Sequence, residues 1–164
     1  MSLLEEVELL RRVPLFADIE PAKLKLIAFT SERVNFDPDQ YVFHQGDMGD
    51  AAYIIMDGDA DVLIDGPGGA RAVARVGRNE FIGEIAILCD VPRTASIRAR
   101  SRVVALRISK DLFFRMLSDF PKMSLAIMRV IAQRLENTTA QLRRVLAEAQ
   151  LAEVEIAKAH STEG

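Results

Sequence analysis

Hydrophobic positions follow three successive patterns along the chain. From residue 3 to about residue 30, apolar residues recur every three or four positions with breaks at Pro14 and Pro21, which predicts two short amphipathic helices. From Arg33 to Ser109 the pattern changes to short β-type runs bounded by Gly, Asp, Asn or Pro. The expected strands are residues 33–37, 41–44, 52–56, 60–65, 72–76, 95–100 and 103–109. Many short strands at regular spacing are typical of a β-sandwich or β-roll.

Turn and cap residues mark the ends of these elements. The Gly66-Pro67-Gly68-Gly69 run predicts a hairpin tip, because glycine permits positive φ and proline limits strand continuation. Ser109 is a candidate helix N-cap, with Asp111 in the first turn, and the sequence beyond it is helical to the end with a break at Pro121.

The last helix carries a long apolar seam from about residue 122. The seam consists of two rows that each repeat every seven residues and together alternate spacings of three and four. One row is Met128, Leu135, Leu142, Ala149 and Ile156, and the other is Ile131, Thr138, Val145 and Ala152. A seam of about four heptads favours a coiled-coil homodimer with parallel helices. A lone helix lying on the roll would show a similar stripe at its start. The sequence therefore predicts an α+β chain with an N-terminal helical segment (1–32), a β-roll (33–109) and C-terminal helices (110–164).

Composition restricts the class of protein. The 164 residues, 49% hydrophobic and 27% charged, suit one globular domain with an appendage. A net charge of −3 gives no field that would attract nucleic acid or an anionic membrane. The single Cys excludes an internal disulfide and a thiolate zinc site, so we expect a reducing, cytoplasmic location. Two histidines are too few for a His-rich metal cage, and no apolar stretch approaches the ~20 residues of a membrane helix.

The segment 81–97 carries the chemistry. Gly83 precedes an apolar run too short for a standard helix, and Pro92 then imposes an extended backbone. A single helical turn between strands exposes unpaired backbone N–H groups, which can bind a phosphate or carboxylate. Arg93 adds a planar cation that can pair with two oxygens of such an anion. Glu84 would repel that anion unless it faces a hydroxyl donor such as a ribose 2′-OH, so the set indicates a nucleotide site.

This segment resembles the phosphate-binding cassette of the cyclic-nucleotide-binding domain family, which includes kinase regulatory subunits and cyclic-nucleotide-gated channels. The resemblance rests on Gly83-Glu84 followed by Pro92-Arg93-Thr94-Ala95, and it extends to residues 13–16 and 45–58. It implies the family's β-roll, with cassette residues 81–97.

The resemblance also implies roles within the cassette. Glu84 is expected to take the ribose 2′-hydroxyl and Arg93 the cyclic phosphate, with the amides of Ile85 and Ala86 capping that phosphate and Thr94 as an added hydroxyl ligand. The candidate ligand-binding residues of the cassette are Gly83, Glu84, Ile85, Ala86, Arg93, Thr94 and Ala95. Alternatively, Arg93 and Glu84 pair with each other across an empty pocket.

Contacts to the base are expected from the last helix. The run Arg134-Leu135-Glu136-Asn137-Thr138-Thr139 resembles the stretch by which the family's catabolite activator protein brings two hydroxyls to the purine, one from the partner subunit. Thr138 lies in the apolar seam and Thr139 beside it, so a dimer could share a ligand there. Arg134, Thr138 and Thr139 are therefore further candidates, although a Thr in a seam can also serve only to set the register.

The identity of the ligand is only partly indicated. Thr94 is similar to the residue that cGMP-responsive relatives use, whereas the Thr138-Thr139 pair resembles an adenine reader, and we favour cAMP over cGMP. No nucleophile, base and orienting group can be assembled around the cassette, so a sensor without a cofactor is expected, not an enzyme.

Other functions remain open at this stage. The chain ends at Gly164 without a second globular segment that could enter a DNA groove, so no direct DNA binding is expected and the downstream partner is unknown. The alternatives are a ligand-free dimerisation or scaffold module, the sensor fragment of a longer transcription factor or channel, and a metal-dependent enzyme of the cupin type.

Overall fold

The computed structural model describes residues 2–162 and divides into two compact units, Met1–Ser124 and Leu125–Gly164. The first unit opens with the two predicted helices, α1 (Leu3–Arg11) and α2 (Pro21–Thr30), joined through a short 3-10 helix, η1 (Pro14–Phe16). Both prolines stand at the first position of their helices, where the missing N–H costs no hydrogen bond.

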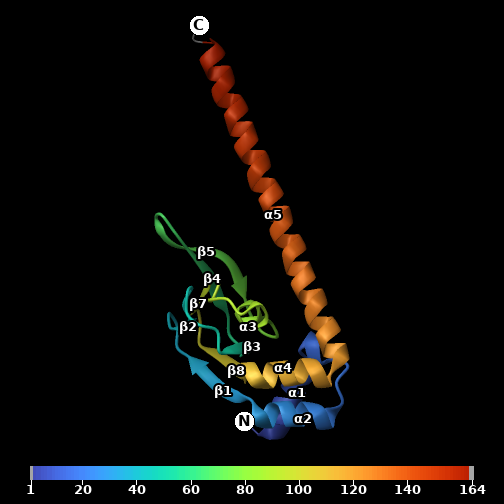
Figure 1. Cartoon of the computed structure of the whole chain (residues 1–164). Helices are drawn as coiled ribbons and strands as arrows, with labels where there is room; N and C mark the ends of the chain where they lie inside the picture. Colours follow the sequence, from blue (N-terminus) through green and yellow to red (C-terminus); the bar gives the residue numbers. More distant parts are fainter. Residues whose placement is uncertain (1, 163–164) are drawn as a thin grey trace. The chain divides into compact units, whose positions relative to one another are not determined.

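The β-type runs form a two-layered roll. Among residues 2–162 there are eight strands: β1 (Glu32–Phe36), β2 (Tyr41–Phe43), β3 (Ala51–Asp57), β4 (Ala60–Gly66), β5 (Gly69–Val76), β6 (Phe81–Ile82), β7 (Ser96–Ala99) and β8 (Val103–Ser109). They pair antiparallel in two four-stranded sheets, ordered β1-β8-β3-β6 and β2-β7-β4-β5 (Figure 1). Buried side chains from both sheets, such as Tyr53 and Ile55 of β3 and Ile97 of β7, form one core between the layers.

The strand predictions hold with local differences. The hairpin tip is confirmed, since Gly66 pairs with Gly69 and Gly69 has φ +100°. Strand β5 begins at Gly69, three residues before the predicted start. The sequence did not indicate this start, because glycine and alanine have weak strand propensity. Strand β6 was not predicted. Its two residues are too few to show alternation, yet Phe81 pairs with Ile54 of β3.

Three helices follow within or after the roll. The short α3 (Glu84–Cys89) lies between β6 and β7, and α4 (Lys110–Asp119) follows β8 directly and packs against β3 and β8 (Figure 1). Ser109 is both the last residue of β8, paired with Ala51, and the N-cap of α4, its hydroxyl accepting from the Leu112 amide at 3.3 Å. The cap prediction is confirmed, and no loop separates strand from helix.

The second unit consists of α5 (Pro121–Thr162) from Leu125 onward. Several of its large apolar side chains, among them Leu135, Leu142 and Val145, are more than half exposed, whereas Ile127 near its start is buried. Among the described residues, no helix combines the length and the apolar character needed to span a bilayer.

Candidate functional site

Gly83 sets the geometry of the segment between β6 and α3. It is the N-cap of α3 in the left-handed region, with φ +85°, and no side chain of the described residues caps the helix. A Cβ at this position would lie 2.7 Å from Nη1 of Arg93 and 3.3 Å from the Ala51 carbonyl oxygen. Glycine is therefore required at position 83 for two reasons, its backbone conformation and the close approach of Arg93.

Arg93 is buried in the roll. The residue is 3% exposed, and its guanidinium lies 4.0 Å from the centre of the Phe43 ring. Nη1 donates to the Gly83 carbonyl at 2.8 Å and Nη2 to the Ala51 carbonyl at 2.7 Å. Burial lowers the pKa of the guanidinium, and nearby Tyr53 and Asp50 oppose the shift.

One donor of this buried cation is not used. Nε of Arg93 has no hydrogen-bond partner among the described residues. A buried N–H without a partner is destabilising, and such donors are normally satisfied by ordered water or by a bound ligand. The side chain thus offers a fixed, desolvated cation with spare hydrogen-bonding capacity, which suits an anionic ligand.

Asp50 connects Arg93 to the start of α4. Its carboxylate lies 3.7 Å from Nη2 of Arg93 and 2.9 Å from Nη2 of Arg107, and its carbonyl accepts from the Lys110 amide at 3.0 Å. The Lys110 ammonium lies 3.4 Å from Asp90 at the end of α3. Lys110, at the start of α4, is therefore joined to the cassette directly through Asp90 and indirectly through Asp50.

The loop between β2 and β3 closes on the cassette. The Arg93 amide donates to the Asp47 carbonyl at 2.8 Å, and the Gly46 amide donates to the Arg93 carbonyl at 2.9 Å. Gly49 packs so closely on α3 that an added Cβ would lie 2.6 Å from Cβ of Ala86. This loop therefore holds both the Arg93 segment and α3 in place.

The structure brings the predicted cassette residues together in the first unit. Glu84 and Ala86 are buried at the start of α3, and Ile85 between them is 41% exposed. Thr94 is exposed and Ala95 half-buried on the approach to β7. Within this group, the Arg93 guanidinium contacts the carbonyls of Gly83 and Ala51 and the carboxylate of Asp50.

The three helix candidates lie in the second unit. Thr138 and Thr139 donate their hydroxyls to carbonyls one turn earlier on α5, those of Arg134 at 2.9 Å and Leu135 at 2.8 Å. Thr138 is exposed, while Arg134 and Thr139 are half-buried. Their contact with a ligand stays a prediction.

Sequence reasoning did not identify Phe43 and Asp50 as neighbours of Arg93. The resemblance had included the Gly49-Asp50 pair only as part of the strand region. Ala51 and Arg93 are 42 positions apart, and their contact depends on the pairing of the sheets. Local pattern carries no signal for such a contact.

Comparison with known proteins agrees with this geometry. Residues 33–120 match the family model described as cyclic nucleotide-binding domain. The chain is 33% identical over 108 residues to a cAMP-dependent protein kinase regulatory subunit of Emericella nidulans, covering 66% of this chain and 26% of that protein. It is 29% identical over 136 residues to a CRP-like cAMP-activated global transcriptional regulator of Mycobacterium tuberculosis, covering 82% of this chain and 61% of the relative.

A solved structure gives the same fold. The catabolite activator protein of Thermus thermophilus superposes with a TM-score of 0.73 at 25% identity, over 80% of this chain and 62% of that one. The chain thus spans only part of the length of each of these relatives.

Proposed function

Because the chain belongs to the cyclic nucleotide-binding domain family, we propose that it binds a cyclic mononucleotide at the cassette and acts as a regulatory sensor, not as an enzyme. The observation that carries this proposal is the buried guanidinium of Arg93, whose Nε has no hydrogen-bond partner within residues 2–162. A cyclic phosphate carries one negative charge and acceptor oxygens, which match a desolvated cation with a spare donor. Glu84, buried at the start of α3, would take the ribose hydroxyl.

We propose cAMP as the preferred ligand. The kinase regulatory subunit and the transcriptional regulator described above are named for cAMP, and the Thr138-Thr139 pair on α5 is the expected reader of the base. The single cysteine is consistent with a cytoplasmic protein.

The first experiment is calorimetric titration with cAMP and with cGMP, after the protein has been denatured and refolded to remove any carried-over ligand. Tight binding of cAMP, with cGMP weaker, is the expected result. No heat of binding with either nucleotide would contradict the proposal.

The variant Arg93→Ala tests the site directly. A buried phosphate without its cation costs about 3–5 kcal/mol, so affinity should fall by at least about a hundredfold. Arg102→Ala removes an exposed arginine of the same roll and serves as the control. Arg93→Lys keeps the positive charge without the planar fork, so it should bind the nucleotide weakly. Residual binding by Arg93→Lys would show that the loss in Arg93→Ala comes from the missing cation and not from unfolding. An Arg93→Ala protein with near-native affinity would reject the assignment.

We also propose that binding moves the C-terminal helices. Asp50 supports this, because its carboxylate contacts Arg93 and its carbonyl holds the Lys110 amide at the start of α4. A ligand that draws Arg93 away from Asp50 changes the surroundings of that helix start, with couplings of about 1–3 kcal/mol typical of such systems. Hydrogen exchange along 128–146 should slow at saturating ligand. Unchanged exchange there would contradict the coupling but not the binding.

A ligand-free dimerisation module is the second candidate. The observation that favours it is that Arg93 already has two carbonyl partners and Asp50. Equal thermal stability with and without either cyclic nucleotide would support this candidate, because a ligand that binds only the folded state must raise the stability.

A further inference from the structure

Helix α2 has apolar side chains on two opposite faces. Leu24 and Ile27 are buried in the first unit. Ala22, Leu26 and Phe29, spaced i, i+4 and i+7, share the other face, where Leu26 is 59% exposed and Phe29 76% exposed. Large apolar side chains that are exposed together on one face of a helix mark a contact site. The outer face of α2 therefore has the character of a contact surface.

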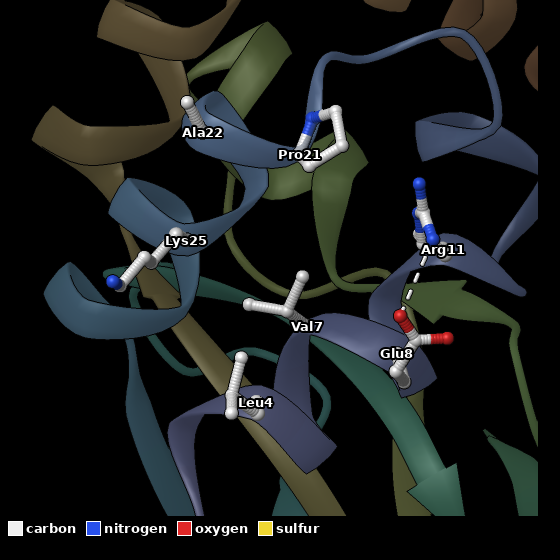
Figure 2. Close-up of a pocket in the computed structure, with 7 residues that line it drawn as sticks. All are labelled: Leu4, Val7, Glu8, Arg11, Pro21, Ala22 and Lys25. Carbon is white, nitrogen blue, oxygen red and sulfur yellow. Dashed lines mark hydrogen bonds and ion pairs between the residues drawn. The ribbon is translucent and has the colours of Figure 1, made fainter.

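A hollow lies beside this face. It has a volume of about 280 Å³ and runs between α1 and α2, with Leu4 and Val7 on one side and Pro21 and Ala22 on the other (Figure 2). Leu4 is itself 73% exposed. The hollow thus extends the exposed apolar surface of α2 onto α1.

The spacing of knob and hollow makes this surface complementary to itself. Phe29 lies seven residues from Ala22, which is about two turns or 10.5 Å along the helix and nearly the same direction around it. A two-fold axis crossing α2 near Leu26 would place each Phe29 against the other chain's Ala22. We infer that the outer face of α2 is an isologous contact with a second copy of this chain, with each Phe29 seated in the hollow of the other.

The charges around the hollow also favour a second copy. Its edge carries Glu8 and Arg11, paired at 3.2 Å, together with Lys25 (Figure 2). A second copy brings the same mixture of signs, so Glu8 of one chain can face a cation of the other. A uniformly acidic or uniformly basic partner would meet at least one like charge.

The size of the face sets the strength of the contact. Two ten-residue helices are each about 15 Å long, and their contact covers less than the roughly 800 Å² per partner of a stable interface. We therefore expect a weak association, seen at high protein concentration and additional to any pairing of α5.

Cysteine cross-linking of the full chain tests the geometry. In a Cys89→Ser background, which removes the exposed native thiol, Leu26→Cys places a thiol close to the two-fold axis. Ala22→Cys lies on the same face, but the two copies of residue 22 would be about 10.5 Å apart along the axis, beyond the Cα separation of about 7 Å that a disulfide spans. Mild oxidation should give a covalent dimer with Leu26→Cys and little with Ala22→Cys.

Phe29→Ser tests the energetics. We expect Phe29→Ser to raise the dissociation constant of the association through α2 at least tenfold in sedimentation equilibrium. Met48→Ser removes an equally exposed apolar side chain from the roll and should leave that dissociation constant unchanged. Circular dichroism checks that both variants are folded. Equal cross-linking at 22 and 26, or an unchanged association of Phe29→Ser, would overturn the proposal.

Discussion

Arg93 shows how far a residue's role can be derived from sequence. The Pro-Arg-Thr-Ala run and the preceding Gly-Glu pair identify it as the candidate anion-binding cation. Its burial, the ring of Phe43 above it and the carbonyl of Ala51 depend on strand pairing over more than forty positions. The chemistry of the side chain was thus predictable, whereas the unused Nε donor required the structure.

A surface pair gives a prediction at the same scale. The Arg78 guanidinium donates to the Asp57 carboxylate at 2.7 Å, and this hydrogen bond holds the Asp57 pKa below its ordinary value. A lowered folded-state pKa stabilises the protein above the unfolded pKa, and the stabilisation is lost as the pH falls through the folded value. Arg78→Gln should therefore reduce the loss of stability on acidification.

The effect of Arg78→Gln should be below about 1 kcal/mol, because both side chains are largely exposed. Urea unfolding at several values between about pH 6 and 2 measures it. Arg102→Gln, an exposed arginine of the same roll, is the control. Superimposable pH profiles for Arg78→Gln and the unaltered protein would refute the role of the pair.

At the scale of elements, pattern succeeded where an element was long enough to show its period. The helices and most strands follow their hydrophobic spacing, and Ser109 caps α4 as its residue type and position predicted. Strand β6 was missed because two residues carry no period. The closure of the loop around Gly49 on α3 could not be predicted, because its close approach to Ala86 is a packing contact between separate elements.

That contact predicts a difference between two glycines. A Cβ at Gly49 would lie 2.6 Å from Cβ of Ala86, so Gly49→Ala must displace α3 or the loop, at a cost of about 1–3 kcal/mol. At Gly68, in the hairpin tip, an added Cβ would meet no atom of the described residues within 4 Å apart from its chain neighbours, so Gly68→Ala should leave stability nearly unchanged. Denaturant unfolding compares the two. Equal stabilities would show that the loop yields without moving α3.

For the molecule as a whole, the sequence predicted a roll followed by a long helix, and both are present. The seam on α5 is exposed in the single chain, with Leu135 at 67%. Pairing through this seam remains a prediction, since exposure of an apolar row indicates a partner without identifying it.

A charged substitution tests the seam. Leu135→Asp should convert a dimer into a monomer in analytical ultracentrifugation at micromolar concentration, because a carboxylate in the seam would be desolvated. Ala140→Asp introduces the same charge on the opposite side of the helix and should leave the assembly intact. A dimer that survives Leu135→Asp would place the interface elsewhere.

The direct junction of β8 and α4 also bears on how the chain can vary in length. Ser109 pairs with Ala51 of β3 and is also the N-cap of α4, so one inserted residue would move the strand pairing and the helix cap to different residues. A deletion there would remove either the strand pairing or the helix cap. The hairpin tip at Gly66–Gly69 does not combine a strand pair with a helix cap, and an added side chain at Gly68 would point into open space among the described residues. Insertions and deletions among chains of this fold should therefore accumulate at the tip and be rare at the junction.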